Sequence, residues 1–258
     1  MKKREARPYI LAETNWKEVR DHSYQLAILP WGATEAHNYH LPYGTDNYQV
    51  EAVAALAAEK TWEAGVKVVV LPVVPFGVNT GQLDISLCIN MNPSTQLAIL
   101  KDLAQVLHLQ KVPKLQILNG HGGNHFKQMI RELEGIYPDV FVSAVDWWRS
   151  APIEEYFHEP GDHAGEMETS AMMHITPDWV RPLEEAGSGA AKVFKFKAFQ
   201  EGWATAQRAW SQVTEDTGVG NPEKSTAEKG RIFIEACAES LASFWIDLAN
   251  TDNRDLYI

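Results

Sequence analysis

The fold of this chain is decided by residues 29–46, which read Leu29-Pro30-Trp31-Gly32-Ala33-Thr34-Glu35-Ala36-His37-Asn38-Tyr39-His40-Leu41-Pro42-Tyr43-Gly44-Thr45-Asp46. The apolar run at 26–30 leads into this stretch and predicts a short buried strand. Four residues able to bind a metal ion then follow within twelve positions: Glu35, His37, His40 and Asp46. If the chain stays extended after the strand, Glu35 and His37 point to the same side, because side chains alternate along an extended backbone.

The chemistry of this stretch favours a transition-metal site. Carboxylate oxygens combined with imidazole nitrogens suit zinc, manganese or iron better than magnesium or calcium. Each residue also has an ordinary explanation, since Asp46 can cap the helix that begins there and a single histidine often bonds a backbone carbonyl. Because four such residues follow directly after a strand, we favour the metal site over four separate structural roles.

Strand-like and helix-like segments alternate along the rest of the chain. Short apolar runs predict strands at 26–30, 67–75, 115–118 and 140–145, and three- and four-residue periodicity predicts helices at 47–64, 92–109, 125–137, 162–175 and 223–249. This alternation predicts a three-layer α/β/α fold with a mainly parallel sheet, in a single domain spanning 1–258. Residues 192–197 alternate in polarity and predict an additional edge strand.

Further polar clusters follow the later strands, and ligands of parallel sheets bind beyond the carboxyl ends of the strands. His121 lies in Asn119-Gly120-His121-Gly122-Gly123-Asn124 and is a candidate metal ligand, although such a turn can also cradle an anion. Glu166 and Glu168 lie about 200° apart on a helix, so at most one faces the site. The other candidates are a proton-transfer residue with its neighbour, His163 and Asp162, and substrate-binding residues, Trp147, Trp148, Asn79 and Gly123. The two tryptophans could equally pack in the core.

The composition restricts the partners and the compartment. The 258 residues carry a net charge of −11, which argues against nucleic acid or an anionic membrane as a partner. An anionic small substrate stays compatible, because a bound dication reverses the local charge. Cys88 and Cys237 are too few for a disulfide framework and predict a reducing compartment. The basic residues 1–8 lack the apolar run of a signal peptide and no stretch approaches a membrane span, so we expect a cytoplasmic protein.

Several of these motifs together resemble the creatininase (creatinine amidohydrolase) family, in its branch with two consecutive glycines. The motifs are Glu35-Ala36-His37-Asn38-Tyr39-His40-Leu41-Pro42, Thr45-Asp46, Asn119-Gly120-His121-Gly122-Gly123-Asn124, His163-Ala164-Gly165, Glu168-Thr169-Ser170 and Gly218-Val219-Gly220-Asn221-Pro222. The resemblance implies two divalent metal ions (zinc, manganese or iron) in a cytoplasmic homo-oligomer, often a hexamer. It implies five ligands, Glu35, His37, Asp46, His121 and Glu168, with Asp46 bridging the ions. It also implies that His163 transfers protons and that Asp162 orients it.

The chain departs from the family pattern in three places. Asn38 stands where the family usually has glycine, and Gly123 stands where creatininase itself has a carboxylate. We therefore assign the remaining carboxylate ligand to Glu168, as in the Gly-Gly branch. The family's Glu-His and Pro-Gly-Thr pattern is absent from residues 81–92, a loop that helps form the pocket. The sequence therefore does not favour creatinine as the substrate.

These features predict a metal-dependent hydrolase that opens a small cyclic substrate, either a cyclic amide or a cyclic ketone or diketone such as a keto-cyclitol. Three alternatives stay open: a formamide hydrolase, a metal-dependent isomerase or lyase acting on a sugar-like ketone, and a non-catalytic metal-binding partner protein. In each enzyme reading the partner is a small molecule, and neither nucleic acid nor a membrane is expected.

Overall fold

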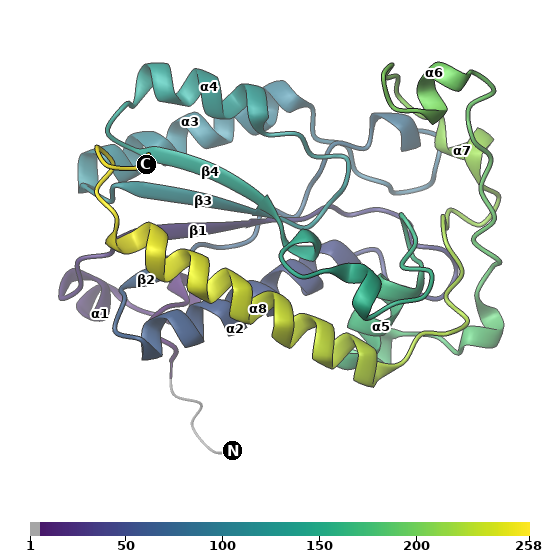
Figure 1. Cartoon of the computed structure of the whole chain (residues 1–258), viewed down its shortest axis with the longest axis horizontal. Helices are drawn as coiled ribbons and strands as arrows, with labels where there is room; N and C mark the ends of the chain where they lie inside the picture. The colour runs from purple at the N-terminus through teal and green to yellow at the C-terminus, as the bar shows by residue number, and fades with distance from the viewer. Residues whose placement is uncertain (1–5) are drawn as a thin grey trace.

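A four-stranded parallel sheet forms the centre of the molecule (Figure 1), as seen in a computed structural model that describes residues 6–258. Its strands are β1 (Leu26–Trp31), β2 (Val68–Val70), β3 (Lys114–Asn119) and β4 (Phe141–Asp146). Every neighbouring pair is parallel, in the spatial order β2-β1-β3-β4. Residues 1–5 of the basic N-terminal stretch lie outside the described part of the chain.

Helices cover both faces of the sheet (Figure 1), which confirms the predicted three-layer fold. One face carries α2 (Thr45–Glu63), α5 (Glu166–Ile175) and α8 (Ala227–Asn250), and the other carries α3 (Pro93–Gln110) and α4 (Lys127–Ile136). Shorter helices are α1 (Trp16–Arg20), α6 (Lys197–Gln200) and α7 (Trp210–Val213). Single 3₁₀ turns occupy Leu11–Glu13, Thr80–Gln82, Trp147–Arg149, Ile153–Glu155, Pro177–Trp179 and Leu183–Glu185.

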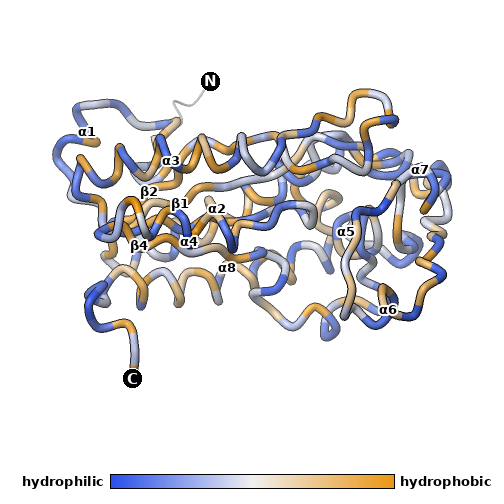
Figure 2. Tube along the Cα trace, turned by 90° about the horizontal axis from the view of Figure 1, so that it is seen from above, coloured by the Kyte–Doolittle hydropathy of each residue, from blue (hydrophilic) through white to orange (hydrophobic). Residues whose placement is uncertain are grey.

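The alternation of side chains along β1 divides the interior into two cores. Leu26 and Ile28 pack with residues of α2 and α8, whereas Leu29 and Trp31 pack with residues of α3 and α4. A strand covered on both faces is therefore apolar at every position, as the sequence of β1 is. Figure 2 shows hydrophobic and hydrophilic turns alternating along α3 and α8, as expected for helices that bury one side. No helix within residues 6–258 is long and apolar enough to span a membrane.

Two strand predictions require correction. The apolar run at 67–75 forms a ladder only over Val68–Val70, because Pro72 and Pro75 have no N–H to donate, although Val74 still donates to the carbonyl oxygen of Pro30 at 3.0 Å. The predicted edge strand at 192–197 is wrong. Only Ala191 forms an isolated bridge, with Thr214, and the following residues lead into α6 beyond the end of the sheet (Figure 1).

The strand order positions the functional site. From β1 the chain winds to β2 on one side, whereas β3 and β4 lie on the other side of β1. The carboxyl ends of β1 and β3 therefore flank the point where the winding reverses, which is where parallel sheets bind their ligands. The segment after β1 contains Glu35 and His37, and the segment after β3 contains His121.

Candidate metal centre and active site

The five predicted metal ligands converge at this end of the sheet, although they come from four segments. Glu35 and His37 follow β1, Asp46 lies in the first turn of α2, His121 follows β3 and Glu168 lies in the first turn of α5. Three groups have candidate ligand atoms that all lie within 4.8 Å of one another: Glu35–Asp46–His121, His37–Asp46–Glu168 and Glu35–His37–His163. Because Asp46 belongs to the first two groups, these groups adjoin and share one carboxylate.

Three histidines of this cluster are held in the same manner. Each donates one ring N–H to a backbone carbonyl oxygen: His37 Nδ1 to Glu35 at 3.1 Å, His121 Nε2 to Val78 at 3.2 Å, and His163 Nε2 to Ala36 at 2.7 Å. A carbonyl oxygen only accepts, so these nitrogens carry the hydrogen and the opposite ring nitrogens face the carboxylates. Metal-binding histidines are typically oriented in this way.

Two carboxylate oxygens of the cluster have no hydrogen-bond donor while the histidines are neutral. Oε1 of Glu35 and Oδ2 of Asp46 are buried and have no hydrogen-bond partner among the described residues. Nδ1 of His121 lies 2.7 Å from the first and 3.1 Å from the second. A buried anionic oxygen without a donor is costly unless a cation neutralises it. The arrangement and the mixed oxygen–nitrogen donor set therefore fit a divalent cation such as zinc or manganese.

The charge of the cluster perturbs the pKa of its members. Burial alone would lower the pKa of His37, but the carboxylate of Asp46 at 2.9 Å outweighs it and raises this pKa to about 10. Burial likewise opposes the charge of His121, and Glu35 and Asp46 raise its pKa well above the ordinary value. For Glu168 burial is the largest effect and raises the pKa of the carboxyl group. The excess negative charge that favours protonated histidines here is the charge that a cation would neutralise.

The glycines around His121 leave room for its ring. A Cβ atom at Gly123 would lie 2.4 Å from both Nε2 of His121 and the carbonyl oxygen of Val78, and would separate these two hydrogen-bonded groups. A Cβ atom at Gly77 would lie 2.6 Å from Cδ2 of the same ring. The two glycines that flank the ring thus permit the orientation in which Nδ1 faces Glu35 and Asp46.

Asn38 shows why this chain tolerates a residue other than glycine at that position. Its φ angle is 56°, in the left-handed region that asparagine adopts more readily than most residues. Its side chain donates to the carbonyl oxygen of Gly187 at 3.1 Å and accepts from the N–H of Gly187 at 2.8 Å. The substitution therefore keeps the backbone turn and ties it to a distant segment.

Only one glutamate at the start of α5 faces the cluster, as the helical geometry predicts. Glu168 accepts from the backbone N–H of Ala164, and its carboxylate belongs to the second ligand group. Glu166 points elsewhere: it pairs with Lys229 and accepts from the backbone N–H groups of His158 and Glu159, both at 2.9 Å. His40 also lies outside the ligand groups, with Nε2 2.8 Å from the hydroxyl of Thr169.

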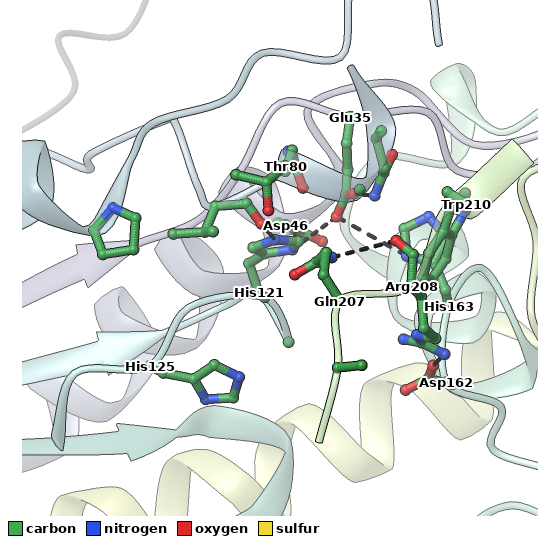
Figure 3. A pocket seen from close by; sticks show the side chains of 18 of the residues that line it. Glu35, Asp46, Thr80, His121, His125, Asp162, His163, Gln207, Arg208 and Trp210 are labelled. Atoms are coloured by element: carbon green, nitrogen blue, oxygen red, sulfur yellow. Dashed lines mark hydrogen bonds and ion pairs between the residues drawn. The ribbon is translucent and has the colours of Figure 1, made fainter. Parts of the chain in front are cut away.

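A cavity of about 450 Å³ opens onto the cluster (Figure 3). It is lined by the expected residues Glu35, Asp46, Asn79, His121, Gly123, Asp162, His163 and Glu168. Sequence reasoning missed other lining residues, among them Gln82, Gln207, Arg208 and Trp210. Gln82 donates to Oε2 of Glu35, and the long irregular loop that contains it was the signal for it. The ring of Trp210 packs edge-on against His163 with centroids 5.3 Å apart, and no periodicity around Trp210 indicated this.

Two other expectations disagree with the structure. Trp147 is fully buried and packs against Phe233, and Trp148 packs against the same core, so neither lines the cavity among the described residues. The carboxylate of Asp162 accepts from Arg208 at 2.7 Å and does not orient His163, whose ring is held by the carbonyl of Ala36. The backbone N–H groups of Asp162 and His163 both donate to the carbonyl oxygen of Val219, at 2.8 and 3.0 Å, while their side chains bond different residues.

Comparison with known proteins agrees with this geometry. The family model described as creatinine amidohydrolase matches residues 12–245. A mycofactocin precursor peptide peptidase from Mycolicibacterium smegmatis is 25% identical over 221 residues, covering 84% of each chain. A crystal structure from Bacteroides fragilis NCTC 9343, provisionally named creatinine amidohydrolase, is 44% identical with a TM-score of 0.90, covering 97% of this chain and 99% of that one.

A more distant structure shares the fold. A mutant creatininase described as Zn-Zn type is 20% identical with a TM-score of 0.75, covering 94% of this chain and 99% of that one. The family match spans most of the chain, and the candidate ligand groups lie inside the matched region. The chain therefore belongs to the creatininase family and is a metal-dependent hydrolase of the amidohydrolase type.

Proposed function

We propose that this protein hydrolyses the C–N bond of a small amide with two divalent cations that share Asp46. Glu35, Asp46 and His121 would hold one cation, and His37, Asp46 and Glu168 the other. One observation carries the proposal: three histidines turn their free ring nitrogens toward a cluster of carboxylates, two of which are buried and present unsatisfied oxygens. Such an arrangement is unfavourable without a cation and favourable with one.

The protein's own groups supply the remaining chemistry. When bound, divalent cations contribute Lewis acidity, which lowers the pKa of water and polarises a carbonyl group. The Nε2–H of His163 is fixed on the carbonyl of Ala36, which leaves Nδ1 free to accept a proton and pass it to the leaving nitrogen. A positioned acid–base group of this kind is worth roughly 10²–10⁴-fold in rate. The ring of Trp210 packs against the His163 ring, which is buried.

The cavity indicates the size and polarity of the substrate. Its volume of about 450 Å³ suits a small molecule. Asn79 is buried in its wall, and Oδ1 of this side chain has no hydrogen-bond partner within residues 6–258. An unpaired buried acceptor favours a ligand with an N–H donor. We therefore favour a small amide, and hydrolysis of a cyclic amide would open its ring.

A second candidate reaction is cleavage of a peptide bond. A cavity of about 970 Å³, lined in part by Phe194, Phe196 and Phe199, shares Gln207 and Arg208 with the first cavity. An extended substrate could occupy both. The similarity to a mycofactocin precursor peptide peptidase supports the same class of substrate.

The test begins with chelator-treated protein reconstituted with Zn²⁺ or Mn²⁺ and assayed against cyclic amides, formamides, short peptides and cyclic diketones. We expect about two ions per chain by elemental analysis, hydrolysis only after reconstitution, and loss of both ions in Asp46→Asn. Solvent ¹⁸O should enter the product, which separates hydrolysis from isomerisation. Full activity in metal-free protein, or normal ion content in Asp46→Asn, would contradict the proposal. Assembly into a homo-oligomer stays a prediction for light scattering to test.

A further inference from the structure

Arg208 is the one lysine or arginine among the described residues that line the cavity at the metal-ligand cluster. The same cavity contains the carboxylates of Glu35, Asp46 and Glu168. Figure 3 places Arg208 beside Asp162, His163 and Trp210, at one side of the cavity, and its side chain is 40% exposed. The cavity therefore combines an acidic cluster with a single permanent positive charge.

The guanidinium group of Arg208 is held from two directions. Nη1 donates to Oδ2 of Asp162 at 2.7 Å, and the guanidinium carbon lies 4.5 Å from the centroid of the Trp210 ring. Trp210 is itself fixed, because Nε1 donates to the carbonyl oxygen of Thr217 at 2.9 Å. The cation is thus preorganised relative to His163, on which the same tryptophan ring packs.

Most donors of this guanidinium group are still available. Arginine offers five N–H donors, and among the described residues only Asp162 accepts from the Arg208 side chain. Nε and Nη2 have no such acceptor. Two N–H groups in one plane match the paired oxygens of a carboxylate or a phosphate.

The segment that contains Arg208 does not depend on the ion pair with Asp162 for its position. A Cβ atom at Gly81 would lie 2.1 Å from the carbonyl oxygen of Arg208, so the two backbones pack directly on each other. The hydroxyl of Ser211 also donates to Oδ2 of Asp84 at 2.5 Å. These contacts hold the backbone at Arg208 and at Ser211, so the segment keeps its position without the ion pair between Arg208 and Asp162.

We propose that Arg208 binds an anionic pair of oxygens, from a carboxylate or a phosphate, on the part of the substrate that lies away from the metal-ligand cluster. This inference rests on the proposed amide hydrolysis and narrows its substrates to amides that carry an anion. The chain has a net charge of −11, so long-range electrostatics do not attract an anion and its recognition depends on a local cation.

Hydroxamates test the inference without knowledge of the substrate, because they chelate metal ions. Zn²⁺-loaded protein would be titrated calorimetrically with alkyl hydroxamates of two to four methylenes that end in a carboxylate, a phosphonate or a neutral carboxamide. We expect the anionic probes to bind about 10- to 100-fold more tightly than the carboxamide, as charge-assisted hydrogen bonds do. Arg208→Gln should remove the difference and Arg208→Lys should keep part of it. If the carboxylate probe binds more tightly than the phosphonate probe, the anion that Arg208 recognises is a carboxylate. The opposite order indicates a phosphate.

Two further variants make the outcome decisive. Asp162→Asn leaves the guanidinium group in place, so anionic probes should bind it at least as tightly as they bind the wild type. Arg149→Gln changes an exposed arginine whose ion-pair partner among the described residues is Asp146, and it should alter nothing. If Arg208→Gln and Asp162→Asn weaken the binding of all three probes alike, Arg208 only holds its segment in place through Asp162, and the inference is overturned.

The failure of the proposed function would look different. In that case no hydroxamate would respond to metal loading. Succinate and propylphosphonate, which lack the chelating group, would still report on Arg208. Equal affinities of these two anions for the wild type and Arg208→Gln would then overturn the inference by themselves.

Discussion

His163 stacks on His37 with ring centroids 4.1 Å apart and planes inclined by 29°. The two rings arrive from segments more than a hundred positions apart, and each is tied to a carbonyl oxygen of the segment after β1. His37 belongs to the second ligand group, whereas Nδ1 of His163 lies 4.0 Å from Oε1 of Glu35. The stacking therefore places an oriented proton acceptor directly beside the proposed cation positions.

This relationship predicts that His163 acts on protons more than on metal. His163→Gln should lower kcat by roughly 10²–10⁴-fold while the metal content stays near that of the wild type. Elemental analysis and steady-state kinetics on the same preparation check both parts. His108→Gln is the control, since that exposed histidine pairs with Asp139 on the surface and should leave kcat unchanged. Loss of an ion in His163→Gln would show instead that His163 is a ligand.

The space around His121 predicts a metal-affinity defect from a single methyl group. In Gly123→Ala the new Cβ atom would displace the His121 ring from the carbonyl of Val78, and loss of such a supporting contact typically costs 10–100-fold in metal affinity. Competition with a fluorescent chelator measures it. Gly122→Ala is the matched control for metal content, because a Cβ atom there meets no atom within 4 Å. Equal affinities in the two variants would refute the packing argument.

His40 predicts a loss of stability in mild acid. Burial, reinforced by the nearby charge of His37, lowers its pKa from 6.5 to about 4, so the unfolded chain binds a proton here at higher pH than the folded chain does. The contribution of neutral His40 to the free energy of unfolding is fully present above pH 6.5 and is lost as the pH falls toward 4. It amounts to at most about 3 kcal/mol.

The comparison of wild type with His40→Gln isolates this effect. The glutamine can still donate to Thr169 but does not titrate, so its urea unfolding free energy should fall less between pH 7 and pH 4.5. Identical pH slopes for the two proteins would exclude His40 as the source of the acid sensitivity.

The contact between α5 and α8 predicts that Gly230 is indispensable. A Cβ atom at this position would lie 1.9 Å from the carbonyl oxygen of Ser170, so Gly230→Ala should force the helices apart and destabilise the protein by about 2 kcal/mol or more. Thermal and urea unfolding measure the loss. Gly135→Ala in α4 is the matched control: its Cβ atom meets nothing within 4 Å, and alanine should stabilise that helix by up to about 1 kcal/mol. A stable Gly230→Ala protein would contradict the close packing.

Local patterns predicted the layered fold and the meeting of the polar residues that follow its strands, whereas the full set of five ligands was implied by the family resemblance. Glu35, His37 and His121 directly follow strands, and parallel strands bring their carboxyl ends to one edge. Asp46 and Glu168 lie at helix starts, which face the same edge.

The positions of the other residues around the cavity depend on tertiary contacts that no local pattern encodes. Trp147 follows β4 as the ligands follow β1 and β3, yet β4 lies at the sheet margin and its tryptophan enters the core beside Phe233. Trp210 and Arg208 reach the cavity from residues 180–222, where periodicity is weak. The backbone of Arg208 packs on Gly81, from another part of the chain, and Nε1 of Trp210 donates to the carbonyl oxygen of Thr217.

The ligand cluster draws on segments that begin at Glu35 and end at Glu168, and these span half of the chain. No excised fragment that lacks either end can build the complete centre, and a nascent chain has all five ligands only after α5 has been synthesised. A cation could therefore bind with all its ligands only after the four segments have folded together. Once bound it would join these segments and lengthen the lifetime of the folded state.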